Sequence, residues 1–87
     1  MHTEPYIDPN IQITEHIPSS FQYEIRKLEE YDKTGSILYF DWSDNFCVSI
    51  KNACAAGGIS KETWDLLEQK YVWHANYIAD KEDGLVK

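Results

Sequence analysis

The sequence predicts an all-α fold: a small three-helix bundle with an extended N-terminal arm. Two observations lead to this prediction. Apolar side chains recur at helical spacing through most of residues 19–83, and glycines separate the three periodic stretches from one another. A chain of 87 residues has room for one hydrophobic core. We therefore expect an arm over residues 1–18 and a single three-helix domain over residues 19–83.

The arm is predicted from its prolines. Pro5, Pro9 and Pro18 bias each preceding residue away from helical geometry. Ile11 and Ile13 alternate with polar residues, which is typical of a short extended piece. Two states of this arm agree with the sequence: it is disordered, or it lies across the helical body.

The first helix is expected to begin near Ser19 and to end before Gly35. Ser19 and Gln22 have the spacing of a capping box. Gly35 is suited to the left-handed position that ends a helix. Phe21, Ile25 and Leu28 supply the apolar face.

The second helix is expected over residues 36–56. Leu38, Trp42, Phe46 and Ile50 form one stripe at helical spacing. An α+β fold with a hairpin at 36–51 is the alternative, because this stretch is rich in β-forming residues. We favour the helix because the stripe continues across the proposed turn and no helix breaker occurs before Gly57.

The third helix has the best-marked start. Ser60 is an expected N-cap, and Ile59 and Trp64 have the spacing of a hydrophobic staple. Helical periodicity then predicts one apolar face. Its members are Trp64, Leu67, Tyr71, His74 and Ile78.

The charge of the chain restricts its partners. The chain has eight basic and fifteen acidic residues, which gives a net charge of −7. Direct binding to nucleic acid or to an anionic membrane requires clustered Lys and Arg, so we expect neither. The longest uninterrupted apolar run is residues 37–40, and residues 1–10 lack the pattern of a signal peptide. We therefore expect a cytoplasmic protein, with a basic protein as its most natural partner.

No catalytic residue, metal site or cofactor site is expected. Cys47 and Cys54 are seven positions apart, about 10 Å along a helix, which is too far for a disulfide or a shared zinc ion. We expect both to be small buried apolar residues. An enzyme that pairs one of these cysteines with His74 is the remaining catalytic alternative.

Residues 71–78 are unusually rich in large side chains. If Tyr71, His74 and Ile78 face the bundle, Trp73 and Tyr77 point elsewhere. Glu62, Asp65 and Glu68 form an acidic edge on the same predicted helix. The candidate partner-binding residues are therefore Trp73, Tyr77, Glu62, Asp65 and Glu68. Alternatively, the arm covers the two aromatic side chains.

Two blocks carry a resemblance: YEIRKLEEYDKTG at 23–35 and AGGISKETW at 56–64. They resemble small uncharacterised helical proteins of Gram-positive gut bacteria and their mobile elements. The second block also resembles the start of short C-terminal oligomerisation domains. The resemblance implies an accessory or phage-borne gene product and no catalytic residues.

The expected function is surface binding without catalysis, by a small acidic protein-protein interaction or accessory protein. Two alternatives remain. One is an acidic, nucleic-acid-mimicking inhibitor of a bacterial defence nuclease, of the anti-CRISPR type. The other is a structural homodimer, since a homo-oligomer could form through the same aromatic patch.

Overall fold

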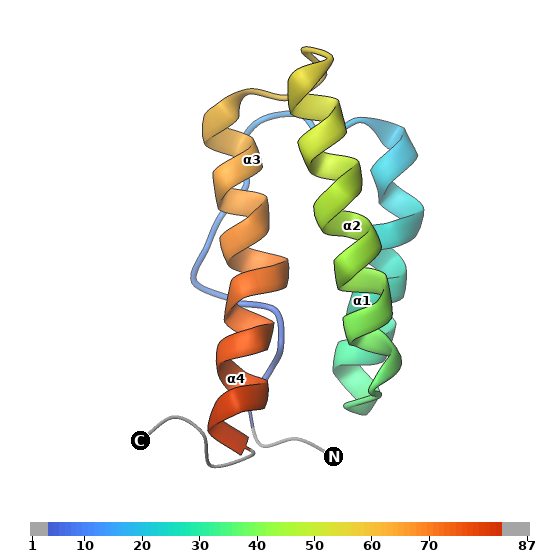
Figure 1. Cartoon of the computed structure of the whole chain (residues 1–87), viewed down its shortest axis with the longest axis vertical. Coiled ribbons are helices and arrows are strands. Elements are labelled where there is room, and N and C mark those ends of the chain that lie inside the picture. Colours follow the sequence, from blue (N-terminus) through green and yellow to red (C-terminus); the bar gives the residue numbers. More distant parts are fainter. Residues whose placement is uncertain (1–3, 83–87) are drawn as a thin grey trace.

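The computed structural model describes residues 4–82, and every regular element within them is helical, so the all-α prediction is confirmed. Residues 1–3 of the predicted arm and residue 83 of the predicted domain lie outside the described residues. Figure 1 shows the helices as rods along the long axis of the molecule. In chain order the elements are the 3₁₀ turn η1 (Ser19–Phe21), α1 (Gln22–Thr34), α2 (Leu38–Ala55), α3 (Lys61–Glu68), the π-helical turn η2 (Gln69–Trp73) and α4 (His74–Glu82).

Residues 38–51 are helical and residues 36 and 37 belong to the preceding turn, which overturns the hairpin alternative at 36–51. Helix α2 runs from Leu38 to Ala55 without interruption. Gly57 follows it with a left-handed φ of 83°, and the Gly58 N–H donates to the Ala53 carbonyl at 2.8 Å. Gly35 has a φ of 69° after α1, where the Ser36 N–H donates to Tyr31. Both glycines therefore end helices in the conformation that glycine adopts most easily.

The predicted capping box at the start of the first helix is wrong. Residues 19–21 form a 3₁₀ turn, and no side chain in the described part of the chain caps either this turn or α1. The cap at Ser60 is confirmed, because its hydroxyl accepts from the Thr63 N–H at 3.1 Å.

The core lies where the three rods face one another. It is built largely from fully or nearly fully buried residues: Tyr6, Phe21, Leu28, Tyr39, Phe46, Ile50, Ile59, Leu67, Tyr71, Val72, Ala75 and Ile78. Helix α2 presents a different stripe from the one predicted. Tyr39 and Ser43 are buried beside Phe46 and Ile50, whereas Leu38 is 46% exposed and Trp42 is only partly buried.

Tyr39 is buried because its hydroxyl has a partner. The hydroxyl donates to the Tyr71 carbonyl at 2.7 Å, which satisfies a polar group inside the core. Burial raises the pKa of Tyr39 strongly, so its phenol remains protonated.

The third rod consists of α3, η2 and α4 in continuous succession (Figure 1). A π turn holds one more residue than an α turn, so it shifts the helical register of everything that follows. Leu67, Tyr71 and Ile78 are buried as predicted, but Trp64 and His74 are only half-buried. Val72 and Ala75, which the regular pattern did not select, are buried instead.

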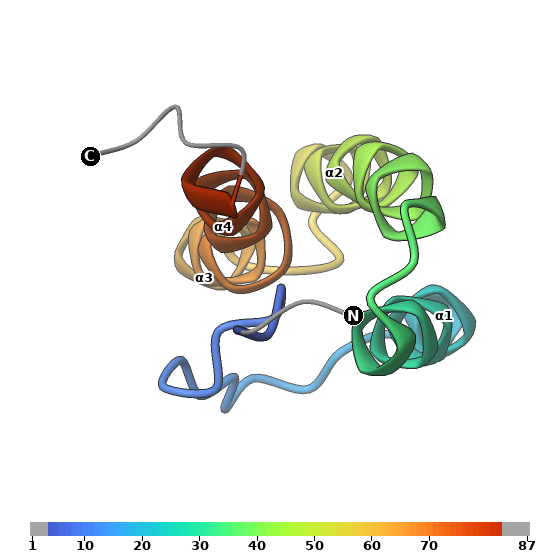
Figure 2. The ribbon, with the colours of Figure 1, turned by 90° about the horizontal axis from the view of Figure 1, so that it is seen from below.

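The described part of the arm, residues 4–18, lies on the helical body. Figure 2 shows it between α1 and the third rod. The Tyr6 N–H donates to the Asp32 carboxylate of α1 at 2.6 Å, and the Asp8 N–H donates to the Lys70 carbonyl at 3.0 Å. The Tyr6 ring packs at 5.0 Å from the rings of Tyr39 and Phe40. The arm thereby closes the core on this side.

Between residues 4 and 82, no helix combines the length and the apolar character that crossing a membrane would require.

Candidate functional site

The predicted acidic edge and Trp73 line one hollow on the third rod. Its volume is 590 Å³ and it is open to solvent. Glu62, Asp65 and Glu68 come from α3, and Trp73 is the last residue of η2. Among residues 4–82, the lining consists of Lys61, Glu62, Trp64, Asp65, Glu68 and Trp73. We call this the tryptophan hollow.

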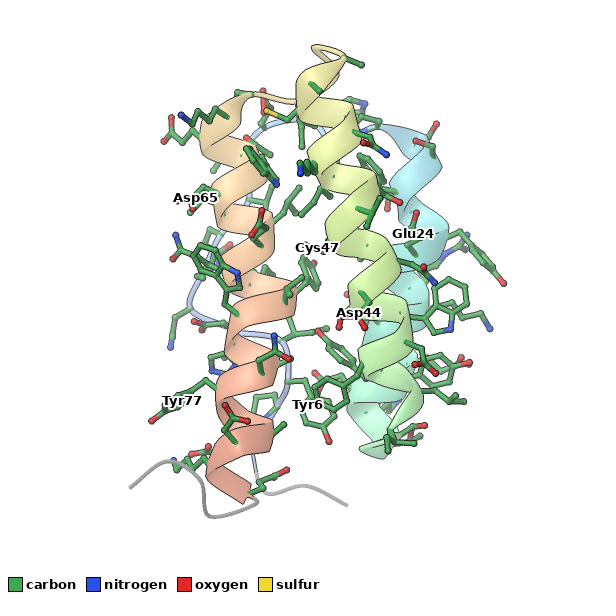
Figure 3. All side chains as sticks on the ribbon, in the orientation of Figure 1. Tyr6, Glu24, Asp44, Cys47, Asp65 and Tyr77 are labelled. Carbon is green, nitrogen blue, oxygen red and sulfur yellow. The ribbon has the colours of Figure 1, made fainter. Side chains whose placement is uncertain are left out.

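Tyr77 lies outside the tryptophan hollow. It lines a separate, smaller hollow of 210 Å³ between α4 and the arm, together with Glu4, Asp8 and Lys81. Figure 3 shows the Tyr77 and Asp65 side chains pointing away from α1 and α2 at different heights along the rod. The structure therefore brings together four of the five candidate residues and separates the fifth.

The arm leaves both candidate aromatic side chains accessible. Trp73 is 51% exposed and Tyr77 is 49% exposed. The arm instead uses polar groups elsewhere on the rod. Lys70 Nζ donates to the carbonyls of Asp8 at 2.9 Å and Ile11 at 2.8 Å, and His74 Nδ1 lies 3.1 Å from the Tyr6 carbonyl.

A salt bridge and a pair of hydrogen bonds fix the two ends of the described arm. Lys81 Nζ lies 3.0 Å from the Glu4 carboxylate near the end of α4. At the other end, Glu15 accepts from the Ser60 N–H and hydroxyl, at 3.1 and 2.9 Å. The pKa of Glu15 is lowered, chiefly because the Thr63 side chain also donates to its carboxylate and then because of the two Ser60 bonds. The arm therefore holds the start of α3, next to the tryptophan hollow.

The charges of the tryptophan hollow are uneven. Of the described residues, three with carboxylates and one with an ammonium group, Lys61, line it. Asp65 accepts from the Gln69 side chain at 2.8 Å. Among residues 4–82, Glu62 and Glu68 have no hydrogen bond or ion pair. The hollow therefore presents unneutralised negative charge.

Glu68 also faces helix α2. Burial raises the pKa of the Cys47 thiol, and the negative charges of Glu68 and Asp44 raise it further. Figure 3 shows Cys47 on α2 on the side of the third rod. A raised pKa keeps the thiol protonated at neutral pH, which is the opposite of an activated nucleophile.

The cysteine predictions are confirmed in part. Both cysteines are free, but they are half-buried and not fully buried as expected. In the described part of the chain, His74 contacts the arm and forms no hydrogen bond with either cysteine. Over the same residues, no group of three or more His, Cys, Asp or Glu side chains is placed to hold a metal ion.

Sequence reasoning missed Trp64 as a member of the tryptophan hollow. The regular helical pattern placed it with the core, and it is indeed packed partly against the core. Its indole Nε1 is shielded from solvent and has no hydrogen-bond acceptor among residues 4–82. Only the register shift at η2 brings Trp73 to the side of the rod that Trp64 occupies, and the sequence gives no local signal for that shift.

In comparisons with protein-family models, curated proteins and solved structures, none matched the chain.

Proposed function

We propose that this chain is a small interaction protein that binds the surface of another protein through the tryptophan hollow and catalyses no reaction itself. One observation carries the proposal: a tryptophan that is half exposed lines an open hollow of 590 Å³. Tryptophan is among the residues that contribute most to binding energy at protein interfaces, particularly where a surrounding rim excludes water.

The charge of the hollow favours a basic partner. Glu62 and Glu68 carry charges that no residue between 4 and 82 neutralises, and the whole chain has a net charge of −7. Negative charge around an interface accelerates association with a positively charged surface and disfavours acidic competitors. Aromatic anchoring and acidic steering thus act on the same surface.

The test is affinity capture from cells that express the protein naturally, with three baits. These are the wild-type chain, Trp73→Ala, and Tyr77→Ala as an equally exposed aromatic control on the same rod. We expect Trp73→Ala to lose the partner, Tyr77→Ala to retain it, and both variants to keep the wild-type circular dichroism spectrum. Identical capture by wild type and Trp73→Ala would overturn the proposal.

Two further measurements separate the alternative functions. A nucleic-acid-mimicking inhibitor would capture a nucleic-acid-binding enzyme, and its affinity would fall steeply with salt. A homodimer would show a doubled mass by light scattering at high concentration, and Trp73→Ala would return it to a monomer.

A further inference from the structure

The π turn places a carboxylate between two tryptophans. In a regular α-helix, residues nine positions apart point in about opposite directions, at roughly 100° per residue. Trp64 and Trp73 are nine positions apart, yet they line the same hollow. One extra residue in η2 makes the step from Glu68 to Trp73 a single turn, as the step from Trp64 to Glu68 already is. The three side chains therefore form a column on one side of the rod.

The chemistry of this column suits a guanidinium group. Indole faces attract cations, and arginine stacks on them more readily than lysine does. A carboxylate pairs with the two parallel N–H groups of a guanidinium. The Glu68 carboxylate is available for this purpose, because it has no hydrogen bond or ion pair among residues 4–82.

The Trp64 indole adds a requirement that an isolated guanidinium does not meet. Its N–H lacks an acceptor in the described chain, and a guanidinium has only donors. A peptide carbonyl beside the arginine supplies the missing acceptor. Since the N–H is shielded from solvent, the carbonyl reaches it only after a small shift of the ring. Free arginine also carries an acceptor, but its carboxylate is repelled by the negative charge of Glu62, Asp65 and Glu68. An arginine within a polypeptide offers a neutral carbonyl and is therefore favoured over the free amino acid.

Resting on the proposed function, we propose that the tryptophan hollow binds an arginine side chain of a basic protein segment. The guanidinium pairs with Glu68 and lies against the indoles of Trp64 and Trp73. Glu62 and Asp65 attract the remaining positive charges of the segment.

The test uses blocked tripeptides and nuclear magnetic resonance of the full chain. The probes are Gly-Arg-Gly, Gly-Lys-Gly and Gly-citrulline-Gly, the last a neutral analogue of the arginine peptide. The chain has three tryptophans, and Trp42 packs against Tyr23 and Tyr31, at ring distances of 5.7 and 6.5 Å, so its indole N–H signal is an internal reference. We expect the arginine peptide to shift the Trp64 and Trp73 signals saturably, with a Kd on the order of 1–10 mM.

The lysine peptide should bind several-fold more weakly, and the citrulline peptide should cause no saturable shift. Glu68→Gln should weaken binding of the arginine peptide roughly tenfold. Asp44→Asn is the matched control, because it removes an exposed charge that does not line the hollow, and it should leave the affinity unchanged.

Three results would overturn the inference: no saturable shift with arginine, equal shifts with citrulline, or equal losses in Glu68→Gln and Asp44→Asn. The last of these would indicate general attraction to an acidic surface. This test is independent of the capture experiment. If capture of a partner depends on Trp73 but the arginine peptide does not bind, the proposed interaction function stands and the proposal that the hollow binds arginine is wrong. If the arginine peptide binds but no partner is captured, arginine binding stands and the proposed interaction function is not supported.

Discussion

Helix α2 and the third rod both supply a large share of the core, but they do so with different backbones. Helix α2 keeps regular α geometry over 18 residues. Its fully buried positions are Tyr39, Ser43, Phe46 and Ile50, which follow one continuous helical stripe. The third rod begins with the same kind of stripe, and then buries Tyr71 and Val72 in succession within η2.

The π turn η2 is stabilised by residues that are far from it in the sequence. Two carbonyls of η2 accept hydrogen bonds from outside the rod: Lys70 from the Asp8 N–H at 3.0 Å, and Tyr71 from the Tyr39 hydroxyl at 2.7 Å. These bonds satisfy backbone groups that an interrupted helical ladder would otherwise leave unpaired. The arm and α2 thus stabilise the turn that brings Trp73 beside Glu68.

The largest expected effect comes from deleting one residue of α2. Removing Val48, which is exposed, turns the following residues by about 100° relative to the preceding ones. Ile50 then turns away from the direction that Tyr39 and Ser43 share, so the buried stripe is broken and the core loses the Ile50 side chain. Small domains have a total stability of about 5 kcal/mol, and we expect this variant to be unfolded at 25 °C. Circular dichroism measures the outcome.

Deleting Gln69 from the π turn is the matched experiment. This deletion removes the extra residue, so α3 and α4 can keep their positions on a regular helix. We expect the free energy of unfolding in urea to change by no more than about 1 kcal/mol. If both deletions unfold the protein, η2 is as intolerant as α2 and the contrast between the two rods fails.

A smaller effect is expected at the start of the third rod. Ser60→Ala removes the cap on Thr63 and the hydroxyl bond to Glu15, while its backbone N–H can still donate to Glu15, and it should lower the free energy of unfolding by about 1 kcal/mol. Ser19→Ala is the control, because Ser19 is exposed and caps no helix; its effect should be near zero. Equal effects in thermal denaturation would show that the Ser60 bonds contribute nothing specific.

The features that were predicted correctly from the sequence are set by residues a few positions apart. The choice of helix over hairpin, the left-handed Gly35 and the cap at Ser60 follow from spacings of a few positions. The acidic members of the candidate site were also found this way, since Glu62, Asp65 and Glu68 are neighbours on one regular helix.

What the sequence could not predict depends on partners far along the chain. Tyr39 is in the core because its hydroxyl reaches Tyr71, 32 positions away. The arm is held because Asp8 and Lys70, 62 positions apart, bond to each other. Trp64 and Trp73 line the same hollow because η2 shifts the helical register, and no spacing rule for a regular helix would have paired them.

The smallest expected effect comes from Trp64 of the third rod, which we compare with Trp42 of α2. Trp64→Phe removes an indole N–H that is buried without an acceptor, so the lost ring area is offset by the removal of an unpaired donor. We expect the free energy of unfolding to change by less than about 0.5 kcal/mol. In α2, Trp42 packs against Tyr23 and Tyr31 and its N–H is not among the shielded unpaired groups. Trp42→Phe should therefore cost about 1 kcal/mol. A loss at Trp64 as large as at Trp42, measured by urea unfolding, would mean that the Trp64 indole is held by its packing alone.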